Sequence, residues 1–165
     1  MQGWDNFFTL VGGTSGTLIG LLFVVLTLGA ERATGGDTMR IRAFVAPVFV
    51  QLSLLLLLAM ILLAPLAEAV RGVITAILAG AGIAYSLYIL ALARGRPELT
   101  EREPLWDGVL PIAGLACLLL SAASWFFAPE HADELAALAA AVLLITALRN
   151  SWAMTLAILS RRGGG

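Results

Sequence analysis

Five long apolar runs constrain the fold of this chain more than any other feature. They cover approximately residues 7–29, 43–64, 73–93, 108–127 and 135–160. Each run is close to the roughly 20 residues that a helix needs to cross a hydrocarbon core about 30 Å thick. Because a helix satisfies its own backbone hydrogen bonds, each run predicts a transmembrane helix. We therefore expect an all-α fold, a polytopic membrane helix bundle of five transmembrane helices forming a single transmembrane domain over residues 1–165.

The composition supports this class and excludes a soluble domain. Hydrophobic residues make up 60% of the chain, charged residues only 13%, and the mean hydropathy is +0.95. Soluble domains are about 45–50% apolar and about 25% charged. The basic residues are all arginine, and most of them lie between the runs rather than on one basic face. We therefore expect membrane lipids as the surroundings and no nucleic acid as a partner.

The arginines outside the runs predict an orientation. Arginine-rich and arginine-poor segments alternate along the chain, so the positive-inside rule predicts an N-terminus outside and a cytoplasmic C-terminus. The successive segments hold no arginine; Arg32, Arg40 and Arg42; Arg71; Arg94, Arg96 and Arg102; no arginine; and Arg161 and Arg162. The tryptophans agree, since Trp4 and Trp125 would lie at the outer interface, and Trp106 and Trp152 nearer the inner one.

The first run carries small residues at four-residue spacing. Gly12, Gly16 and Gly20 fall on one face of a helix. Other residues in the same register extend this face into what we call the glycine stripe: Asp5, Thr9, Gly12, Gly16, Gly20, Phe23 and Thr27. In lipid, small residues let two helix backbones approach closely. The other interpretation is a stripe that lines a water-filled conduit between copies, with Phe23 as its hydrophobic constriction.

The third run repeats this spacing at a second set of positions. They are Gly72, Ala76, Gly80 and Ala84. Two small-residue faces in one chain favour close packing of the first helix against the third.

The last run is interrupted by a polar patch, Arg149, Asn150 and Ser151. A charged side chain within a span either reaches the membrane surface with its long stem or faces a polar interior. The first interpretation makes Arg149 an anchor at the cytoplasmic surface, and the second places the patch in an inner vestibule. Asp5 would then lie at the outer mouth with the opposite charge, so the preferred ion stays open.

Reactive groups are sparse, so we expect no enzyme, metal or cofactor. Cys117 is the only cysteine and His131 the only histidine. Without partners, they are interpreted as a small buried hydrophobe and a solvated turn residue. The Gly13–Gly16 segment resembles the Gly-x-Ser-Gly of rhomboid-type intramembrane proteases. Ser15 would need a base there, but the rhomboid histidine lies within a helix, whereas His131 lies between two runs.

Several short segments together resemble a bacterial family. They are Trp4-Asp5-Asn6-Phe7-Phe8, Val11-Gly12-Gly13, Gly20-Leu21-Leu22-Phe23-Val24 and Asn150-Ser151-Trp152. These look like segments of small bacterial membrane proteins that are sometimes labelled modulator of FtsH protease. The resemblance implies a multi-pass protein of the bacterial inner membrane whose notable residues lie on the first and last helices, and it implies no catalytic residue.

These observations lead to two functional hypotheses. The first is a small homo-oligomeric channel for ions or small solutes, with the glycine stripe at the pore or the subunit interface. The alternative is a non-conducting interaction protein that binds other membrane helices, for example as a modulator of a membrane protease.

Overall fold

The computed structural model describes residues 3–30, 35–94 and 108–160, with side-chain burial assigned over 3–27, 46–91 and 108–152. Its helices are α1 (Asp5–Ala30), α2 (Gly35–Leu63), α3 (Glu68–Arg94), α4 (Leu110–Phe127) and α5 (Ala132–Ser160), with a short 3-10 turn, η3 (Pro129–His131), before α5. No strand occurs within these ranges.

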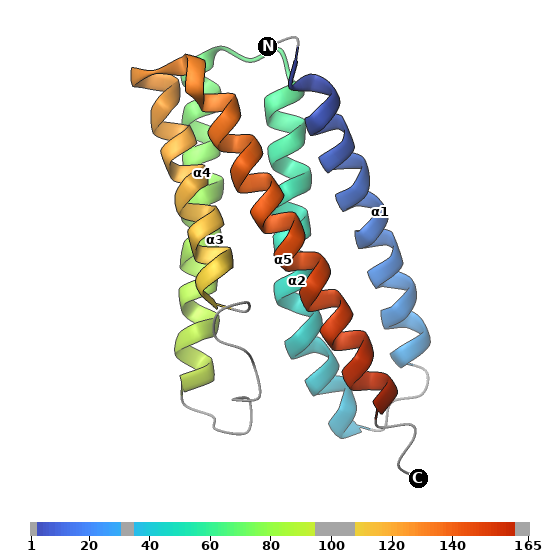
Figure 1. The fold of residues 1–165 in the computed structure, drawn as a ribbon. Helices are drawn as coiled ribbons and strands as arrows, with labels where there is room; N and C mark the ends of the chain where they lie inside the picture. The colour runs from blue at the N-terminus through green and yellow to red at the C-terminus, as the bar shows by residue number, and fades with distance from the viewer. Residues whose placement is uncertain (1–2, 31–34, 95–107, 161–165) are drawn as a thin grey trace.

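All five helices are long and apolar enough to cross a membrane, which confirms the expected class of an all-helical, multi-pass membrane protein. The candidate spans are Asp5–Thr27, Ala46–Leu63, Glu68–Ala91, Leu110–Phe127 and Pro129–Trp152. The start of α1 and the end of α5 lie at opposite ends of the bundle, as Figure 1 shows. We call the end that carries Trp4 and η3 the N-terminal end.

Two helix boundaries were predicted wrongly. The sequence predicts that the second helix starts at about residue 43 and the third at about residue 73, whereas α2 begins at Gly35 and α3 at Glu68. The cause is the same in both cases, because a helix can continue past its apolar segment into polar residues. Arg71, counted above as part of a connection, is therefore a residue of α3, and only 7% of it is exposed.

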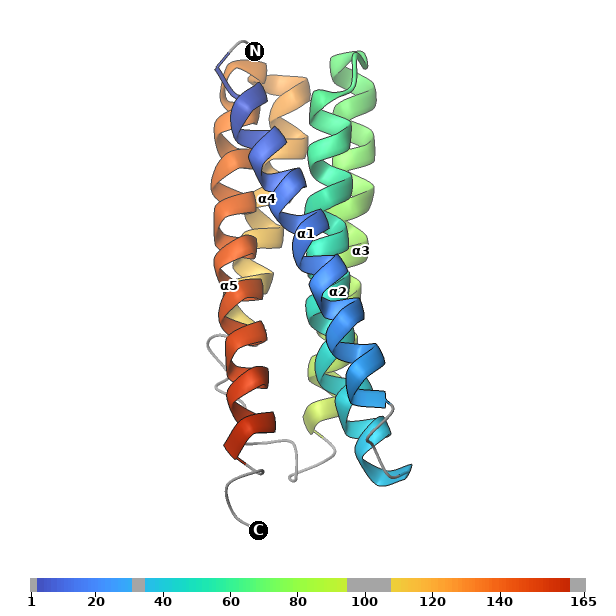
Figure 2. The ribbon, with the colours of Figure 1, turned by 90° about the vertical axis from the view of Figure 1, so that its right-hand side faces the viewer.

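The helices form two hairpins joined by the last helix. α1 packs along α2, and α3 packs along α4, while α5 lies against both α4 and α2 (Figures 1 and 2). The predicted close packing of α1 with α3 is wrong, because α2 lies between them (Figure 2). The small residues of α3 differ in burial instead, since Gly72 is buried while Gly80 and Ala84 are exposed.

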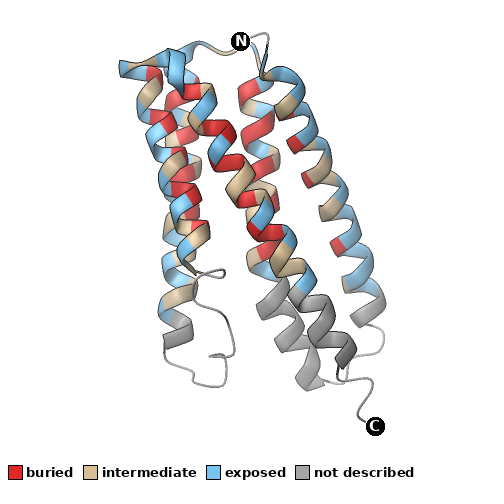
Figure 3. Ribbon diagram, viewed as in Figure 1, coloured by how far each residue is buried: buried red, intermediate tan, exposed pale blue. Residues whose placement is uncertain are grey.

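Alanine and leucine side chains fill the core between α2, α4 and α5. Leu52, Leu55 and Leu58 of α2 are almost completely buried, and the buried residues of α5 are mainly alanines. Figure 3 shows these buried positions as red bands along the facing sides of the helices. Gly114 of α4 allows α5 to approach closely, because a Cβ there would lie 3.0 Å from the Leu143 Cγ atom. Small side chains thus set the spacing of the central helices.

Gly72→Ala should destabilise the α3–α4 hairpin by about 1–3 kcal/mol, as overpacking does in other tight cores. A Cβ at this position would lie 3.0 Å from the Trp125 Cβ atom and 3.1 Å from the Ala122 carbonyl oxygen, neither of which moves freely. SDS-titration unfolding followed by circular dichroism measures the change.

Gly80→Ala is the matched control on the same helix, because a Cβ there meets nothing within 4 Å. It should leave stability unchanged or raise it by up to about 1 kcal/mol through helix propensity. Equal effects of the two substitutions would contradict the packing that we describe.

Candidate functional site

The glycine stripe lies along the side of α1 that faces away from the core. Asp5, Thr9, Gly20, Phe23 and Thr27 are exposed, and the other two members are half-buried. One edge of the stripe borders α2. A Cβ at Gly12 would lie 3.1 Å from the Ala59 Cβ atom, and the Phe23 and Phe49 rings meet edge to face with 5.7 Å between centroids.

The face of α1 that packs into the bundle is a different one. Its buried residues are Phe8, Val11, Ser15 and Leu22. They recur at three-, four- and seven-residue intervals, as expected for one helix face. Sequence reasoning missed this face because α1 is apolar on almost every side, and hydropathy alone does not distinguish the side that packs into the bundle.

The threonine hydroxyls near the stripe are satisfied within α1. Thr9 Oγ1 donates to the Asp5 carbonyl at 2.7 Å, and Thr17 Oγ1 donates to the Gly13 carbonyl at 2.8 Å. Thr27 Oγ1 shares its proton between the Phe23 and Val24 carbonyls at 3.1 and 2.9 Å. Such back-bonding lets a threonine lie in lipid or in a dry helix contact without an unpaired hydroxyl.

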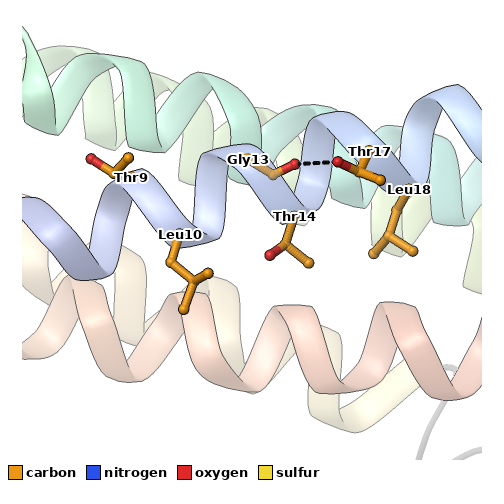
Figure 4. A pocket seen from close by; sticks show the side chains of 6 residues that line it. All are labelled: Thr9, Leu10, Gly13, Thr14, Thr17 and Leu18. Carbon is orange, nitrogen blue, oxygen red and sulfur yellow. Dashed lines mark hydrogen bonds between the residues drawn. The ribbon is translucent and has the colours of Figure 1, made fainter.

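A groove runs along the side of α1 that faces α5. It has a volume of about 520 Å³ and is lined by Thr9, Leu10, Gly13, Thr14, Thr17 and Leu18, which we call the α1 groove. Figure 4 shows Leu10, Thr14 and Leu18 pointing from α1 toward α5. A Cβ at Gly13 would meet nothing within 4 Å, so the glycine leaves open space in the groove. Thr9 is the one residue that the groove shares with the stripe.

The polar patch of α5 lies in the half of the molecule away from the N-terminal end. Arg149, Asn150 and Ser151 are all half-buried. Ser151 Oγ donates to the Ala147 carbonyl at 2.8 Å, while the buried Asn150 Oδ1 accepts no hydrogen bond within the described part of the chain. Asp5 begins α1 at the N-terminal end, so the structure does not bring it together with this patch.

A polar contact that sequence reasoning missed joins α2 to α5 one turn before this patch. The Gln51 side-chain amide donates to the Leu143 carbonyl at 2.8 Å and also to Thr146 Oγ1. Thr146 Oγ1 in turn donates to the Leu143 carbonyl at 2.9 Å. The sequence feature that could have predicted this contact is a glutamine within a leucine-rich segment. The contact fixes the register of the two helices within the membrane.

The groups with reactive side chains lie apart from one another. Ser15 is completely buried and its hydroxyl has no partner among the residues described, while His131 Nδ1 lies 3.5 Å from Glu134 Oε2 on an exposed turn. The structure therefore supplies no base to Ser15. The Cys117 thiol donates to the Leu135 carbonyl at 3.5 Å. No group of three or more His, Cys, Asp or Glu side chains within ranges 3–30, 35–94 and 108–160 could hold a metal ion.

No family model, curated protein or solved structure matches this chain.

Gln51→Met should destabilise the bundle only modestly, by about 0.6–1.7 kcal/mol, the range measured for hydrogen bonds between membrane helices. Methionine keeps the volume, and Thr146 keeps its own hydrogen bond to Leu143, so the substitution leaves no hydroxyl unpaired. Unfolding in SDS measures the loss, and a loss of stability above this range would show that Gln51 holds more than the α2–α5 contact.

Proposed function

We propose that this chain is a non-conducting interaction protein that binds transmembrane helices through the α1 groove, and that its first partner is a second copy of itself. The observation that carries the proposal is the α1 groove, a small-residue hollow on a membrane-spanning helix that no other helix of the chain fills within the described structure.

The position of α1 supports this proposal. Only 11% of the residues in its most apolar 18-residue stretch are buried, compared with 44% in the corresponding stretch of α5, so most of α1 faces the surroundings of the bundle. Lipid chains are as apolar as leucine, so hydrophobicity alone gives two helices no reason to associate. Close approach of two helix backbones at small residues does favour association. Gly13, Gly16 and Gly20 each leave free space for such an approach.

The shape of the groove favours a second copy as the occupant. Leu10, which is 68% exposed, projects beside the hollow at Gly13 on the same helix. A surface that carries both a ridge and an adjacent hollow is self-complementary, as a two-fold contact between identical chains requires. The Thr9 and Thr17 hydroxyls are already bonded within α1, so the contact buries no unpaired hydroxyl from these two residues, and the Thr14 hydroxyl is the one in the groove that a partner helix can bond.

A channel between copies is the second proposal. It is supported by the outward exposure of Asp5, Thr9 and Thr27, which a ring of copies would turn toward a shared axis. It ranks second because the threonine hydroxyls bond to the helix backbone instead of pointing their protons outward.

The resemblance to modulators of FtsH protease suggests a membrane protease or its substrates as further helix partners, and the bacterial inner membrane as the location. We also propose an N-terminus outside and a cytoplasmic C-terminus. The described N-terminal end supports this, because the arginine it holds among the described residues is Arg71, whose side chain is buried.

Gly13→Leu should weaken self-association about tenfold or more, equivalent to about 1.4 kcal/mol, because the leucine fills the hollow that the partner helix needs. The measurement is the monomer–dimer equilibrium of the full chain in lipid nanodiscs or bilayers, by single-molecule photobleaching.

The control for this change is Gly80→Leu, the same substitution at an exposed position of α3 where nothing lies within 4 Å. It should leave the equilibrium unchanged. A protein that is monomeric at every density tested, or equal losses in the two variants, would refute the proposed self-association.

Cysteine labelling should separate the two proposals. In a Cys117→Ser background, Gly16→Cys and Gly20→Cys should not react with a membrane-impermeant thiol reagent if the stripe is dry. Glu130→Cys on the exposed turn should react from outside the cell, which also tests the orientation. Reaction at Gly16 and Gly20 would favour the channel, and ion flux through proteoliposomes would follow.

A further inference from the structure

The N-terminal end of the bundle contains a cavity that the proposed function does not use. Its volume is about 350 Å³, and it is lined by Trp4, Glu68, Trp125, Pro129, Glu130 and Asp133. We call it the Trp4–Trp125 cavity. These residues come from five segments that meet at this end of the molecule: the residues before α1, the start of α3, the end of α4, η3 and the start of α5 (Figure 1).

The two indole rings are fixed walls of this cavity. Trp125 is only 5% exposed, and its Nε1 has no acceptor among the residues that the structure describes. Trp4 is held on α1, because its carbonyl accepts from Phe8 N at 3.0 Å and its ring meets the Phe7 ring edge to face at 5.9 Å. Indole rings attract cations over their faces through the ring quadrupole.

The carboxylates around this cavity outnumber the positive charges that act on them. Glu68, Glu130 and Asp133 come from three different elements and line the same cavity. Arg71 interacts electrostatically with Asp133, and its guanidinium also donates to the Ala64 carbonyl at 2.8 Å and lies 5.6 Å from the centre of the Trp125 ring. The N-terminal amine and Asp5 also act electrostatically on Asp133, so two positive charges face four carboxylates and the field stays negative, which concentrates cations.

The chemistry of the lining favours an organic cation over a bare metal ion. The acidic side chains here do not form a group that could hold a metal ion. A cavity of about 350 Å³ with two indole rings instead fits an organic cation, whose apolar surface contacts the rings while its charge faces the carboxylates.

We propose that the Trp4–Trp125 cavity binds an alkylammonium group of the choline or ethanolamine type. Two sources offer this chemistry, a free amine in solution and the headgroup of a zwitterionic lipid at the membrane surface. The site is separate from the α1 groove, so either proposal can fail while the other stands.

The first experiment compares choline with its neutral isostere, 3,3-dimethylbutan-1-ol. The full chain in nanodiscs of anionic lipid is titrated at low ionic strength, and binding is followed by intrinsic tryptophan fluorescence. Choline should bind saturably and the isostere should not, because only choline carries the charge. Equal binding of the two, or a response to choline no larger than the response to sodium chloride at the same concentration, would overturn the proposal.

Variants then test the lining. Trp4→Leu and Glu130→Gln should each raise the dissociation constant of choline about fivefold or more, since each removes one attractive group. Glu130 is exposed on the turn before α5, so its substitution leaves the fold in place. Glu134→Gln is the matched control, because Glu134 also carries a carboxyl group and lies close by but does not line the cavity. An equal loss in Glu134→Gln would show that only the general negative field attracts choline, and would overturn the assigned site.

Changing the lipid composition of the nanodisc distinguishes a lipid headgroup from a free amine as the source of the ammonium group. If a headgroup is the natural ligand, phosphatidylethanolamine should compete and raise the apparent dissociation constant of choline relative to phosphatidylglycerol alone. If a free amine is the natural ligand, the two lipids should give the same constant. Either result supports the ammonium site and identifies its source.

Discussion

The absence of water from the hydrocarbon core is the constraint on which the rest of this structure depends. Backbone groups there must bond within their own helix, so the spanning segments are helical whatever side chains they carry. Side chains decide only which helices meet and how closely. α1 shows how little burial a span then requires, since only 11% of the residues in its most apolar 18-residue stretch are buried and the remainder is apolar enough to face lipid.

Close packing in this bundle depends on where small residues lie, and not on their presence alone. Gly72 and Gly114 lie where a Cβ would press on Trp125 and Leu143, so these glycines let α3 approach α4 and α4 approach α5 closely. Gly16, Gly20 and Gly80 follow the same four-residue spacing but have nothing within 4 Å. The second group has no packing role inside the chain, and this contrast makes α1 a candidate surface for another helix.

Hydropathy predicted the five helices and the class of protein because the cost of burying polar groups in lipid acts on every residue of a span. The neighbours of each helix could not be predicted in this way. α1 and α3 were paired on spacing alone, and the real contacts depend on side-chain volume at positions such as Gly12 against Ala59. The cavity lining was missed for a similar reason, since Glu68 and Asp133 are 65 positions apart and only the fold brings them together.

The two proposed sites on and beside α1 face different physical problems. The α1 groove lies within the span, where the proposed association would depend on close packing and be insensitive to salt. The Trp4–Trp125 cavity lies at the N-terminal end, where charge would attract the proposed ligand and salt would screen it. Trp4 connects the two, because its carbonyl is bonded to Phe8 N and its ring contacts the rings of Phe7 and Phe8. Any displacement of α1 by a docked helix therefore also moves one wall of the cavity relative to Glu68 and Trp125.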